Sequence, residues 1–429
     1  MKIKTLFALA AVASFSPFLP ASDWPQYRGP NSDGSSSEKL VSAQWSGTGP
    51  AQVWKTVTKD GFSSFAIGAG KAFTLVGRTL AGAYQEVCIA LDATTGKEVW
   101  ATPLSPVKFD GSGNDGTADN RGGEGPRSTP AWSDGKVYVL SARLRLVCLE
   151  ADTGKIAWAK DLMKEHAGRN ISWDSAASPL IAGDLVFVAG GGSGQSLLGL
   201  NKGDGKVIWK GEDAKMTHAS PIAATIHGTR QVIFLTQTGL IAVHPETGKV
   251  LWRHPVRYST STAASPVVGE DVVYCSAGYG VGATAVQIVK SGGTFATREL
   301  WKRPGNKPLA NHWSTPVYYE GHLYGMFSFK EYGKGPMKCV ELATGKIKWE
   351  QPGFGAGNVI RIGSHLLALS DKGELVLAEA TADAYKEISR ADVLDGKCWS
   401  TPAFSNGRVY ARSTREAVCV DLTARAASR

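Results

Sequence analysis

Residues 91–100 read LDATTGKEVW, and the pattern returns as LEADTGKIAW at 149–158. Three further copies, LNKGDGKVIW, VHPETGKVLW and VELATGKIKW, begin at positions 200, 243 and 340. An acidic residue followed by Thr-Gly favours a tight turn, because glycine accepts a positive φ and the Asp or Thr side chain bonds nearby backbone. The flanking residues alternate apolar and polar, which is typical of half-buried strands. Each unit is therefore predicted to be a β-hairpin that ends in a tryptophan.

Weaker copies extend the repeat, with Tyr385 interpreted as a replacement for the tryptophan and Trp54 as an isolated ending. The endings recur every 36 to 58 residues, close to the length of one four-stranded propeller blade. We expect each aromatic side chain to fill the space between neighbouring blades. The eight endings are Trp54, Trp100, Trp158, Trp209, Trp252, Trp301, Trp349 and Tyr385.

A second marker, a small residue followed by Ser/Thr-Pro, keeps the same rhythm. It precedes apolar segments such as 136–140, and proline can begin a strand without spoiling a central ladder. Degenerate copies lie at 63–65 and 357–359, so eight strand starts match eight endings. The full copies are Ser128-Thr129-Pro130, Ala177-Ser178-Pro179, Ala219-Ser220-Pro221, Ala264-Ser265-Pro266, Ser314-Thr315-Pro316 and Ser400-Thr401-Pro402.

The two ends of the repeat region complement each other. The last unit stops near Thr423 before any tryptophan, whereas Val53-Trp54-Lys55 is an ending without preceding strands. We expect the N-terminal strand to complete the C-terminal blade, which removes a sheet edge open to aggregation. The predicted fold class is all-β: a single eight-bladed propeller of four-stranded antiparallel blades over residues 51–424, with a tail at 425–429.

The N-terminus reads as a secretory signal peptide over residues 1–22. Lys2 and Lys4 precede a short apolar stretch, and small residues follow at Ala21 and Ser22. The apolar stretch is too short to span a bilayer. We therefore expect a periplasmic or secreted bacterial protein without a membrane span. No cysteine lies near the expected cleavage point, which argues against a lipid anchor.

The composition is that of a globular protein, with 429 residues of which 43% are hydrophobic and 20% charged. Fifty glycines and thirteen tryptophans fit short strands joined by tight turns. Removing the signal would lower the net charge from +9 to +7, and basic residues are scattered rather than clustered. We therefore expect no nucleic-acid partner. We also expect a monomer.

Three of the six cysteines share one position in the repeat, namely Cys148, Cys339 and Cys419. Ala90, Gly199 and Ala242 hold that position elsewhere, so the site favours a small buried side chain. Equivalent positions in different blades are far apart, which argues against a disulfide framework. Neither a CxxC zinc pattern nor a haem attachment motif is present.

The residues just before each Ser/Thr-Pro marker enter the innermost strands, so we expect them to ring one mouth of the central channel. Aromatic side chains beside Arg, His and Asp are suited to a small polar ligand or a peptide. The alternative is that these side chains plug the channel and bond one another. The candidates are Arg127, Trp173, Asp174, His218, Tyr258, His312, Trp313, Cys398 and Trp399.

The repeats resemble the pyrroloquinoline-quinone (PQQ)-like repeat family, whose consensus is Ala-Leu-Asp-Ala-x-Thr-Gly-Lys-x-x-Trp, over about residues 53–423. Segment 23–31, DWPQYRGPN, looks like the opening of many exported bacterial members. We interpret residues 23–50 as a strap that packs its aromatic side chains on the propeller. The family contains quinoprotein dehydrogenases, which bind PQQ and Ca²⁺ over the channel, and non-catalytic scaffolds, such as a lipoprotein of the outer-membrane barrel-assembly machinery. Fold alone does not choose between these functions.

The dehydrogenases carry adjacent cysteines beneath the cofactor, and this chain has none. A quinoprotein would also need a catalytic Asp and carboxylate and amide ligands for Ca²⁺. The nearest candidates are Asp174 with Asn170, and the loop at 110–120, which lacks EF-hand spacing. We therefore expect a non-catalytic binding propeller without a bound cofactor or metal. A PQQ- and Ca²⁺-dependent oxidoreductase and a barrel-assembly scaffold remain the alternatives.

Overall fold

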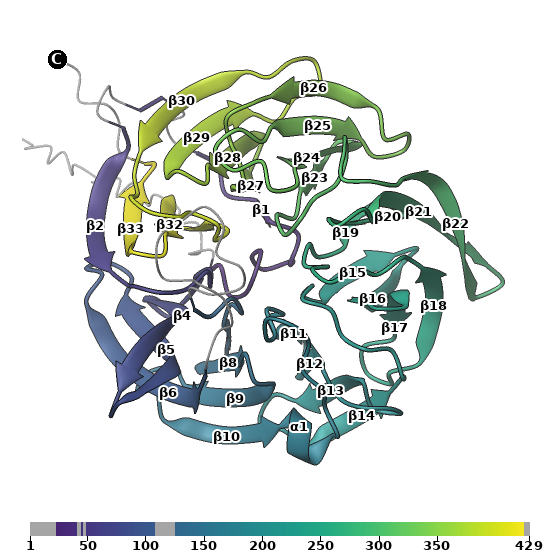
Figure 1. Ribbon diagram of the computed structural model, residues 1–429, viewed down its shortest axis with the longest axis horizontal. Helices are drawn as coiled ribbons and strands as arrows, with labels where there is room; N and C mark the ends of the chain where they lie inside the picture. Colours follow the sequence, from purple (N-terminus) through teal and green to yellow (C-terminus); the bar gives the residue numbers. More distant parts are fainter. Residues whose placement is uncertain (1–22, 41–43, 46–48, 108–124, 424–429) are drawn as a thin grey trace, which may run out of the picture.

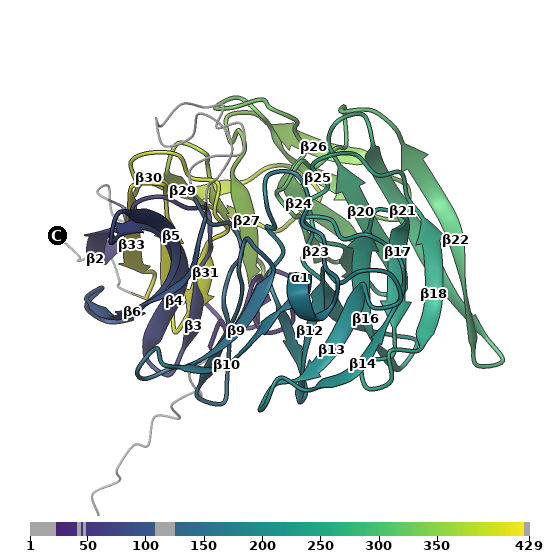
Figure 2. The same cartoon turned by 60° about the horizontal axis from the view of Figure 1, so that its bottom comes forward.

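Eight sheets surround a central axis in the computed structural model, which describes residues 23–40, 44–45, 49–107 and 125–423 (Figure 1). Each sheet contains one blade of four antiparallel strands, and the first strand of each blade lies nearest the axis, as the tilted view in Figure 2 also shows. This confirms the predicted all-β, eight-bladed propeller. The predicted signal peptide at 1–22, the loop at 110–120 and the tail at 425–429 lie outside the described residues.

The blades are numbered here in chain order. Blade 1 consists of β3 (Ala66–Gly68), β4 (Lys71–Leu80), β5 (Ala83–Asp92) and β6 (Glu98–Pro106), and blade 2 of β7 (Ala131–Ser133), β8 (Lys136–Leu140), β9 (Arg145–Glu150) and β10 (Ile156–Asp161). Blade 3 consists of β11 (Leu180–Ala182), β12 (Leu185–Ala189), β13 (Leu197–Asn201) and β14 (Val207–Gly211), and blade 4 of β15 (Ile222–Ile226), β16 (Thr229–Thr236), β17 (Gly239–Val243) and β18 (Val250–Pro255). A short helix, α1 (Leu162–Glu165), follows β10 at the outer side of the ring.

Blades 5 to 8 complete the ring. Blade 5 consists of β19 (Val267–Gly269), β20 (Val272–Ala277), β21 (Gly282–Ser291) and β22 (Thr294–Arg303), and blade 6 of β23 (Val317–Tyr319), β24 (His322–Met326), β25 (Met337–Glu341) and β26 (Ile347–Gln351). Blade 7 consists of β27 (Asn358–Ile362), β28 (His365–Leu369), β29 (Glu374–Glu379) and β30 (Glu387–Asp392), and blade 8 of β31 (Ala403–Ser405), β32 (Arg408–Arg412), β33 (Glu416–Asp421) and the N-terminal β2 (Ala51–Val57).

Blade 8 closes the ring by pairing strands from both ends of the chain. β2 is its outermost strand and runs antiparallel to β33, with Trp54 opposite Cys419. This confirms the expectation that the N-terminal strand completes the C-terminal blade. The pairing satisfies the backbone groups of β33, which would otherwise form an open edge.

Six of the seven repeated tryptophans dock on the turn of the next blade. The indole Nε1 of Trp54 donates to the carbonyl oxygen of Ala93 at 3.0 Å. Gly96 lies under the same ring with φ +70°, and a Cβ there would come within 2.6 Å of the indole. The turn therefore needs glycine for its backbone conformation and for the close approach of the tryptophan. The same donation joins Trp100 to Ala151, Trp158 to Lys202, Trp209 to Pro245, Trp301 to Leu342 and Trp349 to Thr381.

The shared cysteine position is explained by the same packing. Cys148, Cys339 and Cys419 lie directly opposite Trp158, Trp349 and Trp54 in the strand register. A small side chain there leaves room for the indole. All six cysteines lie in the described part of the chain, where each is buried and unpaired.

Two repeats depart from this pattern. The indole of Trp252 donates to Gln231 Oε1 of its own blade at 2.6 Å, because the next blade has a β21–β22 hairpin in place of the Thr-Gly-Lys turn. In blade 7 the strand position of the tryptophan is held by Ser389, opposite Leu377. The interpretation of Tyr385 as the replacement is therefore wrong. Tyr385 lies in the preceding turn and packs on Trp349, with ring centroids 5.5 Å apart.

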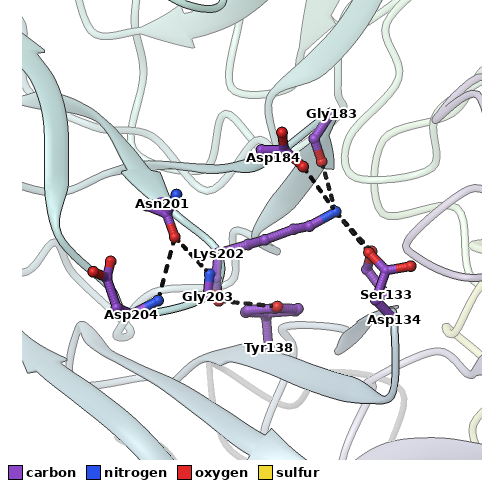
Figure 3. Close-up of polar contacts among 9 residues, drawn as sticks. All are labelled: Ser133, Asp134, Tyr138, Gly183, Asp184, Asn201, Lys202, Gly203 and Asp204. Atoms are coloured by element: carbon purple, nitrogen blue, oxygen red, sulfur yellow. Dashed lines mark hydrogen bonds and ion pairs between the residues drawn. The ribbon is translucent and has the colours of Figure 1, made fainter.

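Lys202 adds a polar connection between blades 2 and 3 (Figure 3). Its carbonyl oxygen accepts from the indole of Trp158 and from the hydroxyl of Tyr138. Its ammonium group lies 2.7 Å from Asp134 and 3.6 Å from Asp184. The backbone and the side chain of one residue thus link neighbouring blades.

The Ser/Thr-Pro markers form a hydrogen-bonded belt around the hub. Each proline directly precedes an innermost strand, as Pro130 precedes β7. The backbone nitrogen of Ser64 donates to the Thr129 hydroxyl, that of Thr129 to Ser178, and that of Ser178 to Ser220, at 2.8 to 3.0 Å. Ser265 and Thr315 repeat the contact in blades 5 and 6. The marker therefore starts the strand and ties four pairs of neighbouring blades together.

The N-terminal strap crosses the hub (Figure 1). Trp24, 1% exposed, forms a backbone bridge with Ile67 of β3. The side chain of Gln26 accepts from the backbone of Ile181 in blade 3. Because Ile67 and Ile181 lie downstream of the markers on their strands, the strap lies at the far end from the loops that precede the markers.

The strap then reaches the opposite blades. The buried guanidinium of Arg28 donates to the carbonyl oxygens of Thr315 and Pro316 at 2.8 and 2.7 Å. The short strand β1 (Ser35–Ser36) runs parallel to β27 as a fifth strand of blade 7. Residues 24–36 therefore contact blades on several sides of the hub.

Candidate functional site

A pocket of about 490 Å³ lies in the hub and is called the hub pocket below. One end of the pocket is formed by loops that precede the innermost strands of the blades and by loops that follow the second strands of the blades. In an antiparallel blade these loops share one end, because the first strand begins where the second strand finishes. The predicted residues found in the lining are Arg127, Trp173, His218, His312, Trp313 and Trp399.

Two predicted residues and one buried cysteine do not line this pocket. Asp174 accepts from Asn170 Nδ2 at 2.7 Å and lies 3.4 Å from Arg143. Tyr258 directs its hydroxyl toward the Thr260 carbonyl at 3.5 Å. Cys398 is fully buried, and burial raises the pKa of its thiol. Most of the residues that directly precede a Ser/Thr-Pro marker therefore line the hub pocket; the expectation that they would is called the marker rule below. Whether a given side chain points into the pocket depends on the conformation of its own turn.

The structure adds aromatic residues that the sequence did not single out. Phe62 directly precedes the degenerate marker at Ser63-Ser64, so the same rule applied to that copy would have found it. Tyr279 and Tyr332 come from loops after second strands, which carry no marker. Tyr27 reaches the pocket from the strap at the far end of the hub. Only the assembled ring brings these four side chains together.

Aromatic rings cover two sides of the hub pocket. Trp399 stacks with Phe62 and with Tyr332, with ring centroids 5.3 Å apart in both pairs. Trp313 lies against Trp399 at 4.7 Å and thereby joins this wall. On the second side, Trp173, His218, Tyr279 and His312 contact one another, and His312 lies against Trp313 with ring centroids 4.1 Å apart, so the two sides form one continuous aromatic lining. Rigid aromatic walls provide contact area at a small cost in conformational entropy.

The two histidines of the lining are buried, each with 6% of its surface exposed. The ring nitrogens of His312 make no hydrogen bond within the described residues, whereas His218 interacts with the Ser172 backbone. Burial lowers the pKa of His218 to about 3, with Arg127 adding to the effect and the Ser172 backbone opposing it. Burial, Lys330 and His218 likewise lower the pKa of His312 to about 3. Both imidazoles are therefore neutral at pH 7.

The charges of the hub pocket are positive. Arg127 and Lys330 are the charged side chains among the described lining residues, and no carboxylate is among them. Arg127 Nη1 donates to the Trp173 carbonyl at 2.8 Å. The ammonium of Lys330 lies over the rings of Tyr279 and Phe329, 5.4 and 5.7 Å from their centroids. The pocket thus combines aromatic walls with a positive potential.

The lining does not fit a calcium-bound cofactor. Ca²⁺ takes six to eight oxygen ligands and is usually held by carboxylates. Asn170 uses its amide nitrogen on Asp174 and on the Ala142 carbonyl, and its amide oxygen accepts from the Ile171 backbone. Within the described residues, no three His, Cys, Asp or Glu side chains are arranged to hold a metal ion. The second calcium candidate, the loop at 110–120, lies outside the described residues.

The likeness to known proteins agrees with this architecture. A family model described as "Outer membrane protein assembly factor BamB" matches residues 83–351. The chain belongs to the PQQ-like repeat β-propeller family. BamB of Shewanella oneidensis is 23% identical over 288 residues, which cover 65% of this chain and 69% of BamB. The quinoprotein ethanol dehydrogenase of Pseudomonas aeruginosa is 32% identical over 145 residues, covering 30% of this chain and 23% of the enzyme.

Solved structures show the same PQQ-like propeller in both branches of the family. BamB of Moraxella catarrhalis superposes with a TM-score of 0.60 at 18% identity, covering 88% of this chain and 99% of that one. Quinohemoprotein alcohol dehydrogenase of Comamonas testosteroni gives 0.63 at 14% identity, covering 95% and 82%. At these identities the likeness establishes the fold, and function has to be argued from the hub pocket.

No helix among the described residues is long and apolar enough to cross a membrane.

Proposed function

We propose that this protein is a non-catalytic propeller of the bacterial envelope whose hub pocket binds a small polar ligand. The observation that carries the proposal is the hub pocket of about 490 Å³, whose lining combines aromatic side chains with the positive charges of Arg127 and Lys330. Concave sites with mostly apolar walls and a few polar groups are where proteins bind small ligands.

Binding is favoured over catalysis by the chemistry of these side chains. A general base works best with a pKa near the operating pH. His218 and His312 have pKa values of about 3, and the described lining contains no carboxylate to share a proton with them. The lining therefore supports recognition of a ligand rather than proton transfer.

An anionic fluorescent dye, 1-anilinonaphthalene-8-sulfonate, tests the site without knowledge of the natural ligand. We expect one dye per chain in the hub pocket. Ala263 lines the pocket, so Ala263→Trp would fill it and abolish the dye signal. Ala157, exposed on β10, gives the matched control Ala157→Trp, which should bind dye normally. Unchanged dye binding by folded Ala263→Trp protein would overturn the proposal.

A quinoprotein oxidoreductase is the second candidate, favoured by the sequence likeness to the Pseudomonas aeruginosa enzyme. PQQ and Ca²⁺ would be added to the purified protein, followed by absorbance spectra and dye reduction with alcohols. Stoichiometric uptake of PQQ with turnover would replace the non-catalytic proposal. Absence of uptake at saturating PQQ would support it.

A protein scaffold is the third candidate, favoured by the likeness to BamB over most of the repeat region. The name of that relative also supports an envelope location, in agreement with the expected signal peptide. A scaffold of this kind should co-purify with the outer-membrane barrel-assembly machinery from its native host. Ala263→Trp separates the candidates, because filling the pocket should block a small ligand and spare an external protein interface.

A further inference from the structure

The polar groups that face the hub pocket are mostly hydrogen-bond donors. The hydroxyls of Ser178 and Ser220 accept from backbone nitrogens of the belt, which leaves their own protons to be donated. Arg127 and Lys330 can donate and cannot accept. A ligand that satisfies this set must be rich in oxygen acceptors and carry negative charge.

These donors surround the pocket. Arg127 belongs to blade 2 and Lys330 to blade 6, which lie opposite each other in the ring of eight described blades. Ser178 comes from blade 3, and Ser220 comes from blade 4. The matching ligand has oxygen atoms on several sides. A sugar ring has this property, because nearly every ring carbon bears an oxygen.

The aromatic walls fit the faces of such a ring. The C–H bonds of a sugar point out from its faces, and an aromatic ring presents a negative face to them. Trp173 and Tyr279 belong to the same continuous aromatic lining as Trp313 and Trp399, joined through His312. The donors would then bind the oxygens around the ring's edge while the aromatic lining contacts a face of the sugar.

A second pocket of about 650 Å³ adjoins the hub pocket and shares Lys330 and Tyr332 with it. Two of its lysines are neutralised: Lys307 lies 2.5 Å from Glu331, and Lys338 lies 2.8 Å from Glu350. Lys330 and the exposed Lys334 leave the second pocket with positive charge. The positive potential therefore continues outward from the hub, as a chain of repeating anionic units would require.

We propose that the hub pocket binds one end of an acidic oligosaccharide, in which the ring sugars carry carboxylates, and that the next units lie over Lys330 and Tyr332 in the second pocket. This ligand class rests on the proposed function as a binding propeller. It accounts for three separate observations: donors around the rim, aromatic walls, and positive charge that extends beyond the hub.

Oligogalacturonates and oligomannuronates of two to six units are the probes, and displacement of the fluorescent dye and calorimetry are the measurements. We expect the acidic chains to displace the dye. Their methyl esters, which keep the rings and remove the charge, should bind at least about tenfold more weakly, as expected for the loss of charge-assisted hydrogen bonds. Longer chains should bind more tightly than dimers.

Variants assign the contacts. Lys330→Met should weaken the acidic chains about tenfold, whereas Lys206→Met, at an exposed turn of blade 3, should not. Lys334→Met should reduce the advantage of longer chains and leave the dimer unaffected. Trp399→Leu should weaken acidic chains and esters alike, because it removes ring contact and no charge.

The outcomes separate this inference from the proposed function. If the dye binds in the hub pocket and neither acidic series displaces it, or if acids and esters bind equally, the ligand class is wrong and the binding site stands. Displacement by a planar aromatic carboxylate such as 2-naphthoate, without displacement by either sugar series, would also overturn the inference. If the dye does not bind in the hub pocket, both the ligand class and the proposed function are wrong.

Discussion

The ring of Trp54 lies on Gly96, at the turn of the neighbouring blade, so closely that a Cβ on Gly96 would come within 2.6 Å of it. Trp54 is in β2, the strand that closes the propeller, and its indole also donates to the Ala93 carbonyl of that turn. The contact that joins successive blades elsewhere in the ring is thus reused between the first turn and the N-terminal strand. The propeller therefore closes through the same kind of contact that joins its other blades.

Gly96→Ala should destabilise the protein more than a glycine substitution that meets only backbone strain. Gly82 is the matched control, because it has φ +78° and nothing within 4 Å of an added Cβ. We expect Gly82→Ala to cost about 1 kcal/mol of unfolding free energy and Gly96→Ala about 2–4 kcal/mol, the excess coming from overpacking against Trp54. Urea unfolding followed by circular dichroism measures both. Equal losses would contradict the proposed close contact.

Arg28→Met should release the strap from blade 6. The substitution keeps an unbranched side chain and leaves the Thr315 and Pro316 carbonyls without their buried donor. Each unpaired carbonyl costs about 1–3 kcal/mol. We expect a lower midpoint in urea and faster protease cleavage within residues 23–40. Arg298→Met, on the exposed outer strand β22, is the control and should change neither.

The repeat spacing predicted the fold because most blades satisfy the same local requirements: a glycine turn, a tryptophan that docks on the next turn, and a proline before the inner strand. Blade 7 shows the limit of that reasoning. Tyr385 matched the repeat by residue type, whereas strand register gives the tryptophan position to Ser389. The Ser389 hydroxyl accepts from the backbone nitrogen of Trp45, a partner 344 residues away. A pattern within one repeat cannot reveal such a contact.

The hub pocket was predictable only in part for a related reason. The marker rule locates the entry of each inner strand, and Trp173, His218 and Trp399, which precede markers, line the hub pocket. Tyr27 lines the pocket because the strap crosses the hub, and Lys330 does so because the loop after β24 folds over Tyr279. Both depend on packing between distant segments. Whether these residues bind a ligand stays a prediction.

Glu86→Gln should change how stability depends on pH. The Glu86 carboxyl is fully buried, accepts from the Ala142 backbone at 2.9 Å, and has its pKa raised by burial to about 8. Between pH 4.5 and 8 the folded state therefore holds a proton that the unfolded state has released. Its contribution makes stability fall as pH rises through that range.

Gln keeps the acceptor and cannot ionise, so Glu86→Gln should remove that fall in stability. The unfolding free energy of the variant should gain on the wild type by up to about 1.4 kcal/mol for each pH unit above 4.5. Urea unfolding at pH 4.5, 6 and 8 measures the difference. Glu98→Gln, on the exposed outer strand β6, should leave the pH dependence of the wild type unchanged. A constant offset between Glu86→Gln and wild type would show that Glu86 ionises normally.

His218 and His312 should act in the opposite direction. Both pKa values fall to about 3 in the folded state, whereas an unfolded histidine takes up its proton near pH 6.5. Below pH 6.5 the unfolded state therefore binds more protons, and stability should fall as the pH drops toward 3. Above pH 6.5 neither histidine contributes a slope.

The double variant with His218→Gln and His312→Gln should have a smaller slope of unfolding free energy against pH. The reduction should be up to about 2.7 kcal/mol per pH unit between pH 6 and 4, which is the sum for two groups. His227→Gln, far from the hub pocket, controls for the loss of a histidine. Because a bound anion would favour the protonated imidazoles, the acidic oligosaccharide should reduce the slope of the wild type and leave the double variant unaffected. A wild-type slope that the ligand does not change would show that the two histidines do not face the bound carboxylate.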